Sequence, residues 1–121
     1  MATEINIDGF HYDEYVEILF QGRDRSGYPL SDAASQVITL VISGTAGGVA
    51  DPGGEWSTAT GHIVLVDAPE AKWEISLTPD DLSDLSEGKV YYYNIWSQLT
   101  PDTPILQAKG RFTLLDSINP S

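Results

Sequence analysis

The sequence has 121 residues, the length of one domain, and carries eighteen acidic residues against six basic ones, a formal net charge of -12. A chain of this length buries roughly two-thirds of the surface that it exposes when unfolded, so it needs no disulfide or metal to fold. The absence of Cys excludes disulfides, thiolate zinc sites and Cys nucleophiles. The acidic excess disfavours nucleic acid as a partner, because such a surface repels phosphate groups.

Residues 1–14 are predicted to form an N-terminal arm or one short edge strand. Their apolar residues are few and are separated by Asp, Asn and Gly. They contain no basic region followed by an apolar stretch, and no run of about 18 apolar residues occurs in the sequence. We therefore expect no signal peptide, no transmembrane segment and no membrane partner.

Two strands are expected next, at residues 15–21 and 35–43, because both segments are rich in β-branched and aromatic residues. Residues suited to a turn separate them: Asp24, Gly27 and Pro29. In the second strand, one alternating set is expected to face the interior: Ile38, Leu40 and Ile42. Residues 44–61 contain six Gly and lack periodicity, which predicts a long loop or a splayed hairpin.

A hairpin is predicted from residues 62–66 and 72–77, with alternate residues of its second strand on one face: Trp73, Ile75 and Leu77. Thr78 is suited to cap a helix of about two turns that has Pro79 at its first position. Asp80 and Asp81 would then face the positive end of the helix dipole. Gly88 would end this helical segment in a left-handed conformation.

The last two strands are predicted at residues 89–98 and 105–115, followed by a C-terminal tail at residues 117–121. In the first of them, alternation divides the side chains between an inward set, Tyr91, Tyr93 and Ile95, and an outward set, Tyr92, Asn94 and Trp96. In the second, Phe112 and Leu114 are expected to be core residues, and Gly110 is expected to mark a bulge.

These elements predict an all-β fold, an immunoglobulin-like antiparallel β-sandwich of about seven strands with one short helical turn. Leu85, Gly88 and Tyr91 have the spacing L-x-x-G-x-x-Y at the start of a late strand. In immunoglobulin-like sandwiches a Tyr at this position donates its hydroxyl to the chain a few residues upstream, which fixes the crossing between the sheets. We predict that these three residues form such a structural corner within a sandwich at residues 15–116.

The turn RDRSGYPLS, the stretch WEISLTPDDLSDLSEGKVYYYNIW and the final strand ILQAKGRFTLLD follow one another in this order. Together they resemble the small immunoglobulin-like modules of tailed-bacteriophage virion structural proteins, of the baseplate and tail-fibre attachment type. The residues that carry the resemblance are Asp24, Gly27, Pro29, Leu77, Thr78, Asp81, Leu85, Gly88, Tyr91, Tyr93, Ile95, Gly110, Phe112 and Leu114.

The resemblance implies a non-enzymatic structural protein of a phage particle, which holds a rigid β-sandwich in a symmetric assembly. A place in the tail, baseplate or fibre attachment ranks first and capsid decoration ranks second. The implied partners are other virion structural proteins and further copies of the chain. The implied location is the virion, or the host cytoplasm before assembly.

The sequence holds no recognisable catalytic or metal-binding motif. His11 and His62 are its candidates for a base near neutral pH, and neither accompanies a nucleophile motif such as G-x-S-x-G. Asp80, Asp81 and Asp84 lack the ligand spacing of an EF-hand, and helix capping explains them. We therefore predict no enzyme activity, no metal site and no cofactor.

The candidate partner-binding residues are three aromatic side chains: Trp56, Tyr92 and Trp96. Large aromatic residues are enriched at interfaces, because they bury much area at a small entropy cost. The alternative is that these rings belong to a second small core. If they are exposed and coplanar, they would instead suit a carbohydrate-binding β-sandwich module, in which they stack on sugar rings.

Overall fold

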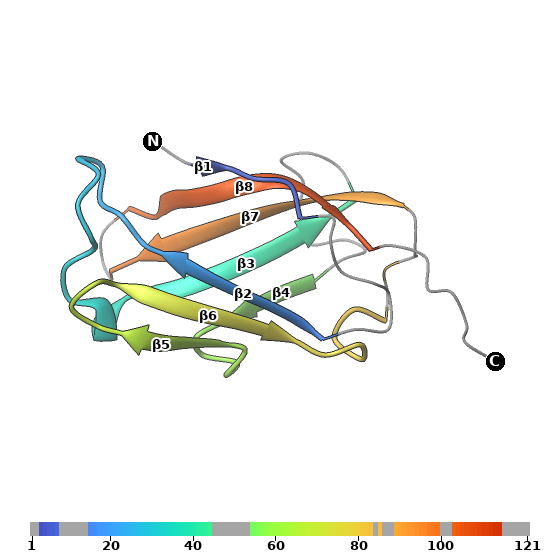
Figure 1. The fold of residues 1–121 in the computed structure, drawn as a ribbon, viewed down its shortest axis with the longest axis horizontal. Helices are drawn as coiled ribbons and strands as arrows, with labels where there is room; N and C mark the ends of the chain where they lie inside the picture. The colour runs from blue at the N-terminus through green and yellow to red at the C-terminus, as the bar shows by residue number, and fades with distance from the viewer. Residues whose placement is uncertain are drawn as a thin grey trace.

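The computed structural model describes residues 3–7, 15–44, 54–83, 85, 89–99 and 103–114. Within them, eight strands form two sheets that lie face to face (Figure 1). One sheet has the order β1-β8-β7-β3-β4 and the other has the order β2-β6-β5. The strands are β1 (Thr3–Glu4), β2 (Val16–Gln21), β3 (Val37–Ser43), β4 (Gly54–Ser57), β5 (Ile63–Asp67), β6 (Lys72–Leu77), β7 (Val90–Gln98) and β8 (Ile105–Thr113).

The strand order is that of an immunoglobulin domain. Strands β2, β6 and β5 correspond to B, E and D, and strands β3, β7 and β8 correspond to C, F and G of that fold. Strand β4 pairs with β3 at the position of the strand that variable-type domains add. The named neighbours are antiparallel except for β1, which runs parallel to β8. The fold is therefore an immunoglobulin-like β-sandwich, as the sequence predicts.

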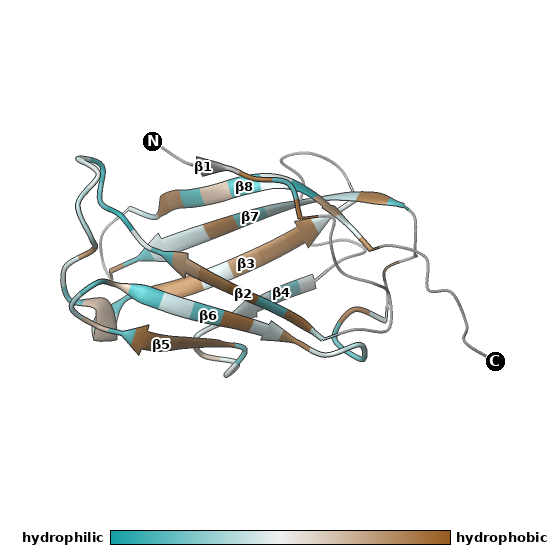
Figure 2. Ribbon diagram, viewed as in Figure 1, coloured by the Kyte–Doolittle hydropathy of each residue, from teal (hydrophilic) through white to brown (hydrophobic). Residues whose placement is uncertain are grey.

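The core lies between the sheets and consists of alternate residues of each strand. The predicted inward residues of β3, β6, β8 and the position after β8 are at most 1% exposed: Ile38, Leu40, Ile42, Trp73, Ile75, Leu77, Phe112 and Leu114. The indole of Trp73 stacks on the ring of Phe20 with 5.8 Å between centroids. Figure 2 shows hydrophobic residues concentrated along β3 and β5, whereas the turn after β2 is hydrophilic.

That turn has the predicted chemistry. The Asp24 carboxylate accepts hydrogen bonds from the backbone N–H groups of Ser26 at 2.9 Å and Tyr28 at 3.0 Å. Gly27 has a φ of 89°, which a residue without a Cβ adopts without strain. After the turn, η1 (Ala33–Ser35) leads into β3 and is the helical turn of the described residues.

Residues 3–7 form an edge strand along β8, which is one of the two alternatives predicted for residues 1–14. The backbone N–H of Ile5 donates to Lys109 O at 2.9 Å, and that of Ile7 donates to Arg111 O at 2.8 Å. The Tyr93 hydroxyl donates to Ile5 O at 2.6 Å, so a core side chain also holds this strand. Residues 8–14 lie outside the described residues.

Gly110 has a different role from the predicted bulge. It keeps a regular pair with Tyr93, and the register shift of this hairpin lies between Ile95 and Trp96. A Cβ at Gly110 would collide with the Ile5 carbonyl group, well inside the 3.0 Å that real Cβ atoms keep from their neighbours. Glycine is needed here because the N-terminal strand approaches the β8 backbone closely.

The predicted two-turn helix after β6 is wrong. The described residues there form consecutive turns, in which Leu82 N–H donates to Pro79 O at 3.2 Å and Leu85 N–H donates to Leu82 O at 3.0 Å. Leu82 and Leu85 are 0% and 2% exposed, so their side chains close one end of the core. Each of these hydrogen bonds spans three residues instead of the four of an α-helix, so the segment is a series of tight turns. Gly88 lies outside the described residues.

Of the two alternatives predicted for residues 44–61, the long loop is wrong for the second half, because β4 lies there and pairs antiparallel with β3 as in a hairpin. Strand β4 pairs with β3 and places Trp56 opposite Leu40 in the interior. Trp56 is 7% exposed and therefore belongs to the core. A strand of four residues is too short to show a period in the sequence, and the surrounding Gly residues conceal it. Residues 45–53 lie outside the described residues.

Candidate functional site

The outer face of the five-stranded sheet carries two of the three predicted partner-binding residues. Tyr91, Tyr93 and Ile95 are buried, as predicted. The intervening residues of β7 lie on the opposite face and are partly exposed: Tyr92, Asn94 and Trp96. The third residue, Trp56, points into the core from β4 and contributes nothing to this face.

A groove of about 320 Å³ lies beside Trp96 on this outer face. Trp96 stands opposite Thr39 of β3 and Leu106 of β8, in the middle of the sheet. The residues that line the groove are Val37, Thr39, Val41, Glu55, Trp96, Gln98 and Pro104. This lining is mostly apolar and has a few polar atoms, so it suits a ligand that is apolar over most of its surface and polar at its edge.

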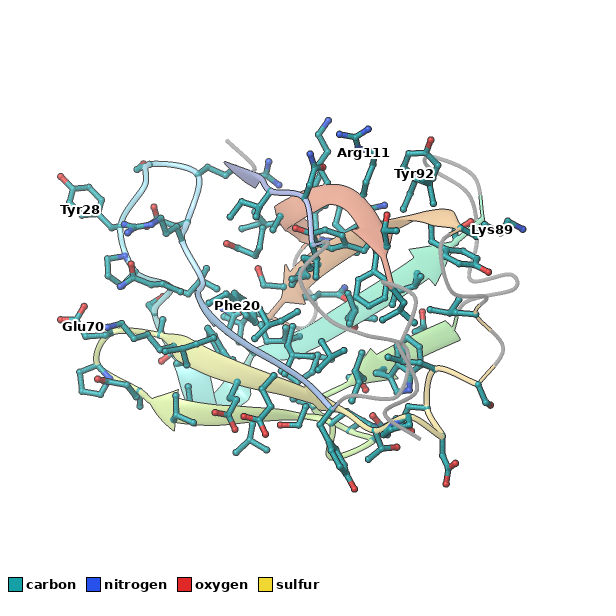
Figure 3. All side chains as sticks on the ribbon, turned by 45° about the vertical axis from the view of Figure 1, so that its right-hand side comes forward. Phe20, Tyr28, Glu70, Lys89, Tyr92 and Arg111 are labelled. Atoms are coloured by element: carbon teal, nitrogen blue, oxygen red, sulfur yellow. The ribbon has the colours of Figure 1, made fainter. Side chains whose placement is uncertain are left out.

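Two cations flank the aromatic residues on the same face. Lys109 is paired in register with Asn94, and Arg111 with Tyr92, and both cations are exposed. Figure 3 shows Tyr92 and Arg111 side by side and directed away from the interior. These are two of only six basic residues in a chain of net charge -12. Glu4 of β1 and Glu55 of β4 occupy the two ends of the row that holds Lys109, so the outer face combines aromatic side chains with charges of both signs.

The predicted structural corner is described in part. Leu85 and Tyr91 are buried, and the Lys89 Nζ lies 5.3 Å from the centroid of the Tyr91 ring. Gly88 lies outside the described residues, and the hydrogen bond of the Tyr91 hydroxyl to the upstream chain stays a prediction.

Tyr93 holds the N-terminal edge strand in place, whereas the sequence predicted it only as a core side chain. Its hydroxyl holds the N-terminal edge strand through Ile5, and burial raises the pKa of Tyr93 to about 12. Alternation along β7 places the ring inward, but the parallel pairing of residues 3–7 with β8 has no signal in the sequence.

A second polar cluster lies at one end of the sandwich around His62, one of the two residues that the sequence offers as a base near neutral pH. The His62 Nε2 lies 3.1 Å from Asp81 Oδ1, and its Nδ1 lies 2.7 Å from Thr60 Oγ1. Asp81 Oδ2 accepts a hydrogen bond from the Thr78 N–H at 2.8 Å. The Asp81 N–H in turn donates to Thr78 Oγ1 at 3.2 Å, so the predicted capping contact of Thr78 is present.

The order hydroxyl, imidazole, carboxylate occurs in hydrolases, but here each group has a structural partner. Thr60 Oγ1 accepts the Ser57 N–H at 3.0 Å and lies 2.9 Å from Ser57 O, within a tight turn. Burial raises the pKa of Asp81, whereas its hydrogen bonds with Thr78 and His62 lower it, and the net effect is a pKa below the usual value. The cluster joins the turn before β5 to the turn after β6, and we interpret it as a structural contact.

The described part of the chain holds no cluster of three or more His, Cys, Asp or Glu side chains that could bind a metal ion. In the same residues, no helix is long and apolar enough to cross a membrane. The acidic residues Asp80 and Asp81 lie in the turns after β6, and Asp84 lies outside the described residues.

No known family model matches the chain, and no curated protein is similar to it in sequence. Among solved structures, the chain is similar to extracellular domains 3–5 of Drosophila OTK, with 15% identity and a TM-score of 0.43. The similarity covers 97% of this chain and 33% of that structure, so the chain spans about one third of its length. The assignment of the fold rests on the strand order and register described above.

Proposed function

We propose that the chain is a non-enzymatic structural module of a tailed-phage particle, which contacts neighbouring proteins through the outer face of its five-stranded sheet. The observation that carries the proposal is the partly exposed pair Tyr92 and Trp96 beside the exposed Lys109 and Arg111. Aromatic side chains and Arg are the residue types that contribute most to protein interfaces. The five-stranded sheet behind them holds their positions.

The polar groups of the described residues also favour a structural role. Every buried side-chain N or O atom among them has a hydrogen-bond partner, as in a rigid structural domain. Gln107 illustrates this use: its amide accepts from the Arg23 N–H and donates to Arg23 O, both at 2.8 Å. These bonds join β8 to the turn after β2 and stiffen the sandwich.

The resemblance of the turn after β2, the segment through β7 and the last strand to virion modules favours the tail, baseplate or fibre attachment. Capsid decoration ranks second, because it needs the same rigid sandwich with one adhesive face. In either position the partners are other virion structural proteins and further copies of the chain, and the location is the virion or, before assembly, the host cytoplasm.

Mass spectrometry of purified particles tests this proposal. Particles made from a phage genome that encodes the chain should contain it at a fixed ratio to the other structural proteins. Particles from the same genome with this gene deleted should lack attached fibres or decoration in electron micrographs. Recovery of the chain only from the soluble fraction of the lysate, with normal particles after deletion, would refute the proposal.

The groove beside Trp96 favours a second candidate, a carbohydrate-binding module. An indole flanked by Thr39, Glu55 and Gln98 could stack on a sugar ring and bind its hydroxyl groups. The wider platform of three aromatic residues is not formed, because Trp56 is buried. A glycan array separates the two: a sugar that binds the native chain and not Trp96→Ala would favour this candidate, and an empty array would remove it.

A further inference from the structure

Strand β5 forms one edge of the three-stranded sheet and is paired on one side only. The order of this sheet is β2-β6-β5, and no strand of the described residues lies beyond β5 (Figure 1). An edge strand presents N–H and C=O groups that have no partner in the sheet and can pair with a further strand. The edge of β5 is therefore a surface that can accept a strand.

The register identifies the residues whose main-chain groups face outward from this edge. The Ser76 N–H donates to His62 O at 2.9 Å, so these two residues form a hydrogen-bonded pair of β6 and β5. Hydrogen-bonded pairs alternate with non-hydrogen-bonded ones along antiparallel strands, so Val64 is the next residue whose groups face β6. The N–H and C=O groups of Ile63 and Leu65 face away from β6, toward the edge.

A groove of about 530 Å³ lies beside β5, so a further strand would find open space there. One wall of the groove consists of Ile63, Val64 and Leu65, and η1 with the first residue of β3 contributes to the lining. Figure 2 shows that β5 is hydrophobic along most of its length. Leu65 is only partly buried and belongs to the inward-facing set of β5, so an added strand would also cover its side chain.

This edge is also a place where two acidic molecules can approach each other. The chain has a net charge of -12, yet residues 61–66 contain no Asp, Glu, Lys or Arg. Asp67, at the end of β5, is paired in register with Lys72. Glu74 lies opposite Val64 on β6, and in two copies joined along β5 the two Glu74 side chains would be about 14 Å apart, three strand spacings. Salt screens charges at that separation, because the Debye length is about 8 Å at physiological ionic strength.

We propose that two copies of the chain pair antiparallel through β5, with the two Val64 residues opposite each other on a two-fold axis. Ile63 of each copy then forms a hydrogen-bonded pair with Leu65 of the other copy. Four hydrogen bonds result, and they use every outward N–H and C=O group of these residues. The edge of β5 is thus complementary to itself, and the neutral stretch lies at the centre of the contact.

The pairing would join the two three-stranded sheets into one sheet of six strands, which is an ordinary size. Each Leu65 would stand beside Ile63 of the other copy, at the mouth of the groove. The contact uses the same strand of both copies, so it closes at two copies. It lies apart from the outer face around Trp96, and the inference does not depend on the proposed function.

Cysteine cross-linking tests the register directly, because the chain has no Cys of its own. In a non-hydrogen-bonded antiparallel pair the Cα atoms are about 4.5 Å apart, which lies within the range of about 4.4–6.8 Å found for disulfides. We therefore expect the full chain with Val64→Cys to form a disulfide-linked dimer under mild oxidation. A thermal melt of the reduced variant checks that it is folded.

Val66→Cys is the matched control. Val64 and Val66 lie on the same strand and are 54% and 53% exposed. In the proposed pairing the two Val66 residues are four positions apart along the joined strands, about 13 Å, which is too far for a disulfide. This variant should stay monomeric under the same oxidation. Equal cross-linking of the two variants, or none in either, would overturn the inference.

Sedimentation velocity over a range of concentrations tests the contact without a covalent bond. The native chain should dimerise, and Val64→Lys should raise the dissociation constant roughly tenfold or more, because it places two like charges directly opposite each other. Leu19→Lys adds the same charge at a residue that is 61% exposed on β2, the other edge of the sheet, and should leave the dissociation constant near its native value.

A native chain that stays monomeric at the highest concentration would overturn the inference, as would a Leu19→Lys variant that dissociates as readily as Val64→Lys. These results are independent of the particle experiment. The chain can be found in particles without pairing through β5, and can pair through β5 without being found in particles.

Discussion

Replacing Gly110 by Ala should release the N-terminal edge strand from β8. The added Cβ would meet Ile5 O and lie 2.7 Å from the Ile5 carbonyl carbon, and both are backbone atoms that cannot rotate away. Residues 5–7 would have to move outward from β8. A displacement of about 1 Å would break hydrogen bonds of 2.8–2.9 Å, because they weaken steeply beyond their usual length.

The cost follows from the bonds that hold this strand. Four hydrogen bonds join Ile5 and Ile7 to β7 and β8: Ile5 N–H to Lys109 O, Ile7 N–H to Arg111 O, Thr113 N–H to Ile7 O, and Tyr93 O–H to Ile5 O. Each contributes about 1 kcal/mol to stability, or about 4 kcal/mol together. The freed residues regain backbone entropy, which offsets part of this loss. We expect the free energy of unfolding to fall by about 1–3 kcal/mol.

Urea denaturation measures that free energy, and hydrogen exchange locates the change. The amides of Ile5 and Ile7 should lose their protection in Gly110→Ala, while those of β3 keep theirs. Gly27→Ala is the matched control, because its Cβ would find open space and add only local strain at a φ of 89°. It should leave Ile5 and Ile7 protected. If Gly110→Ala also leaves both amides protected, the close approach described here is wrong.

Three further predictions concern the core and the two titrating groups. Trp73→Ala should cost about 3–5 kcal/mol in urea denaturation, whereas the partly exposed Trp96→Ala should cost much less, and equal losses would contradict the assigned core. Because the pKa of Asp81 is below its usual value of 3.8, its contribution is complete above that pH and is lost as the pH falls through the pKa of the folded state. Asp81→Asn should therefore be less stable at neutral pH and show a flatter decline in acid, and a parallel decline would refute this reading. Because the pKa of Tyr93 is raised from 10.0 to about 12, stability should fall as the pH rises through that interval, and Tyr93→Phe, unlike Tyr92→Phe, should remove this alkaline loss in a pH titration of unfolding.

The strands that bury one face could be predicted because their side chains alternate. In β3, the set Ile38, Leu40 and Ile42 was recognisable from hydrophobic period alone, and the structure buries all three. The same reasoning separated Tyr93 from Trp96 on the two faces of β7. A wrong register would have moved each of these side chains to the other face, so burial determines the pattern strongly.

The sequence missed two elements for different reasons. Strand β4 is short and lies among glycines, and it is a strand because β3 offers it a partner. In β4, tertiary packing thus overrides the local preference of the chain. The turns after β6 are a different case: the capping residues are present, but the hydrogen bonds that follow span three residues and form no α-helix.

The sequence predicted only part of the candidate site, because the other part depends on contacts between residues far apart in the chain. The sequence identified Tyr92 and Trp96 on the outer face, because alternation along one strand separates them from the core. It missed the cations beside them, since Lys109 and Arg111 reach that face only through the pairing of β8 with β7. His62 and Asp81 are 19 residues apart, and no local pattern indicates that their side chains meet.

Lysine footprinting of purified particles tests most directly whether the chain works by contact through its outer face. The reactivity of Lys109 toward an amine-labelling reagent would be compared between the particle and the isolated, monomeric chain. The account predicts that Lys109 is exposed in the isolated chain and strongly protected in the particle, where a neighbouring protein covers the aromatic residues beside it. Equal reactivity in the two states would contradict it.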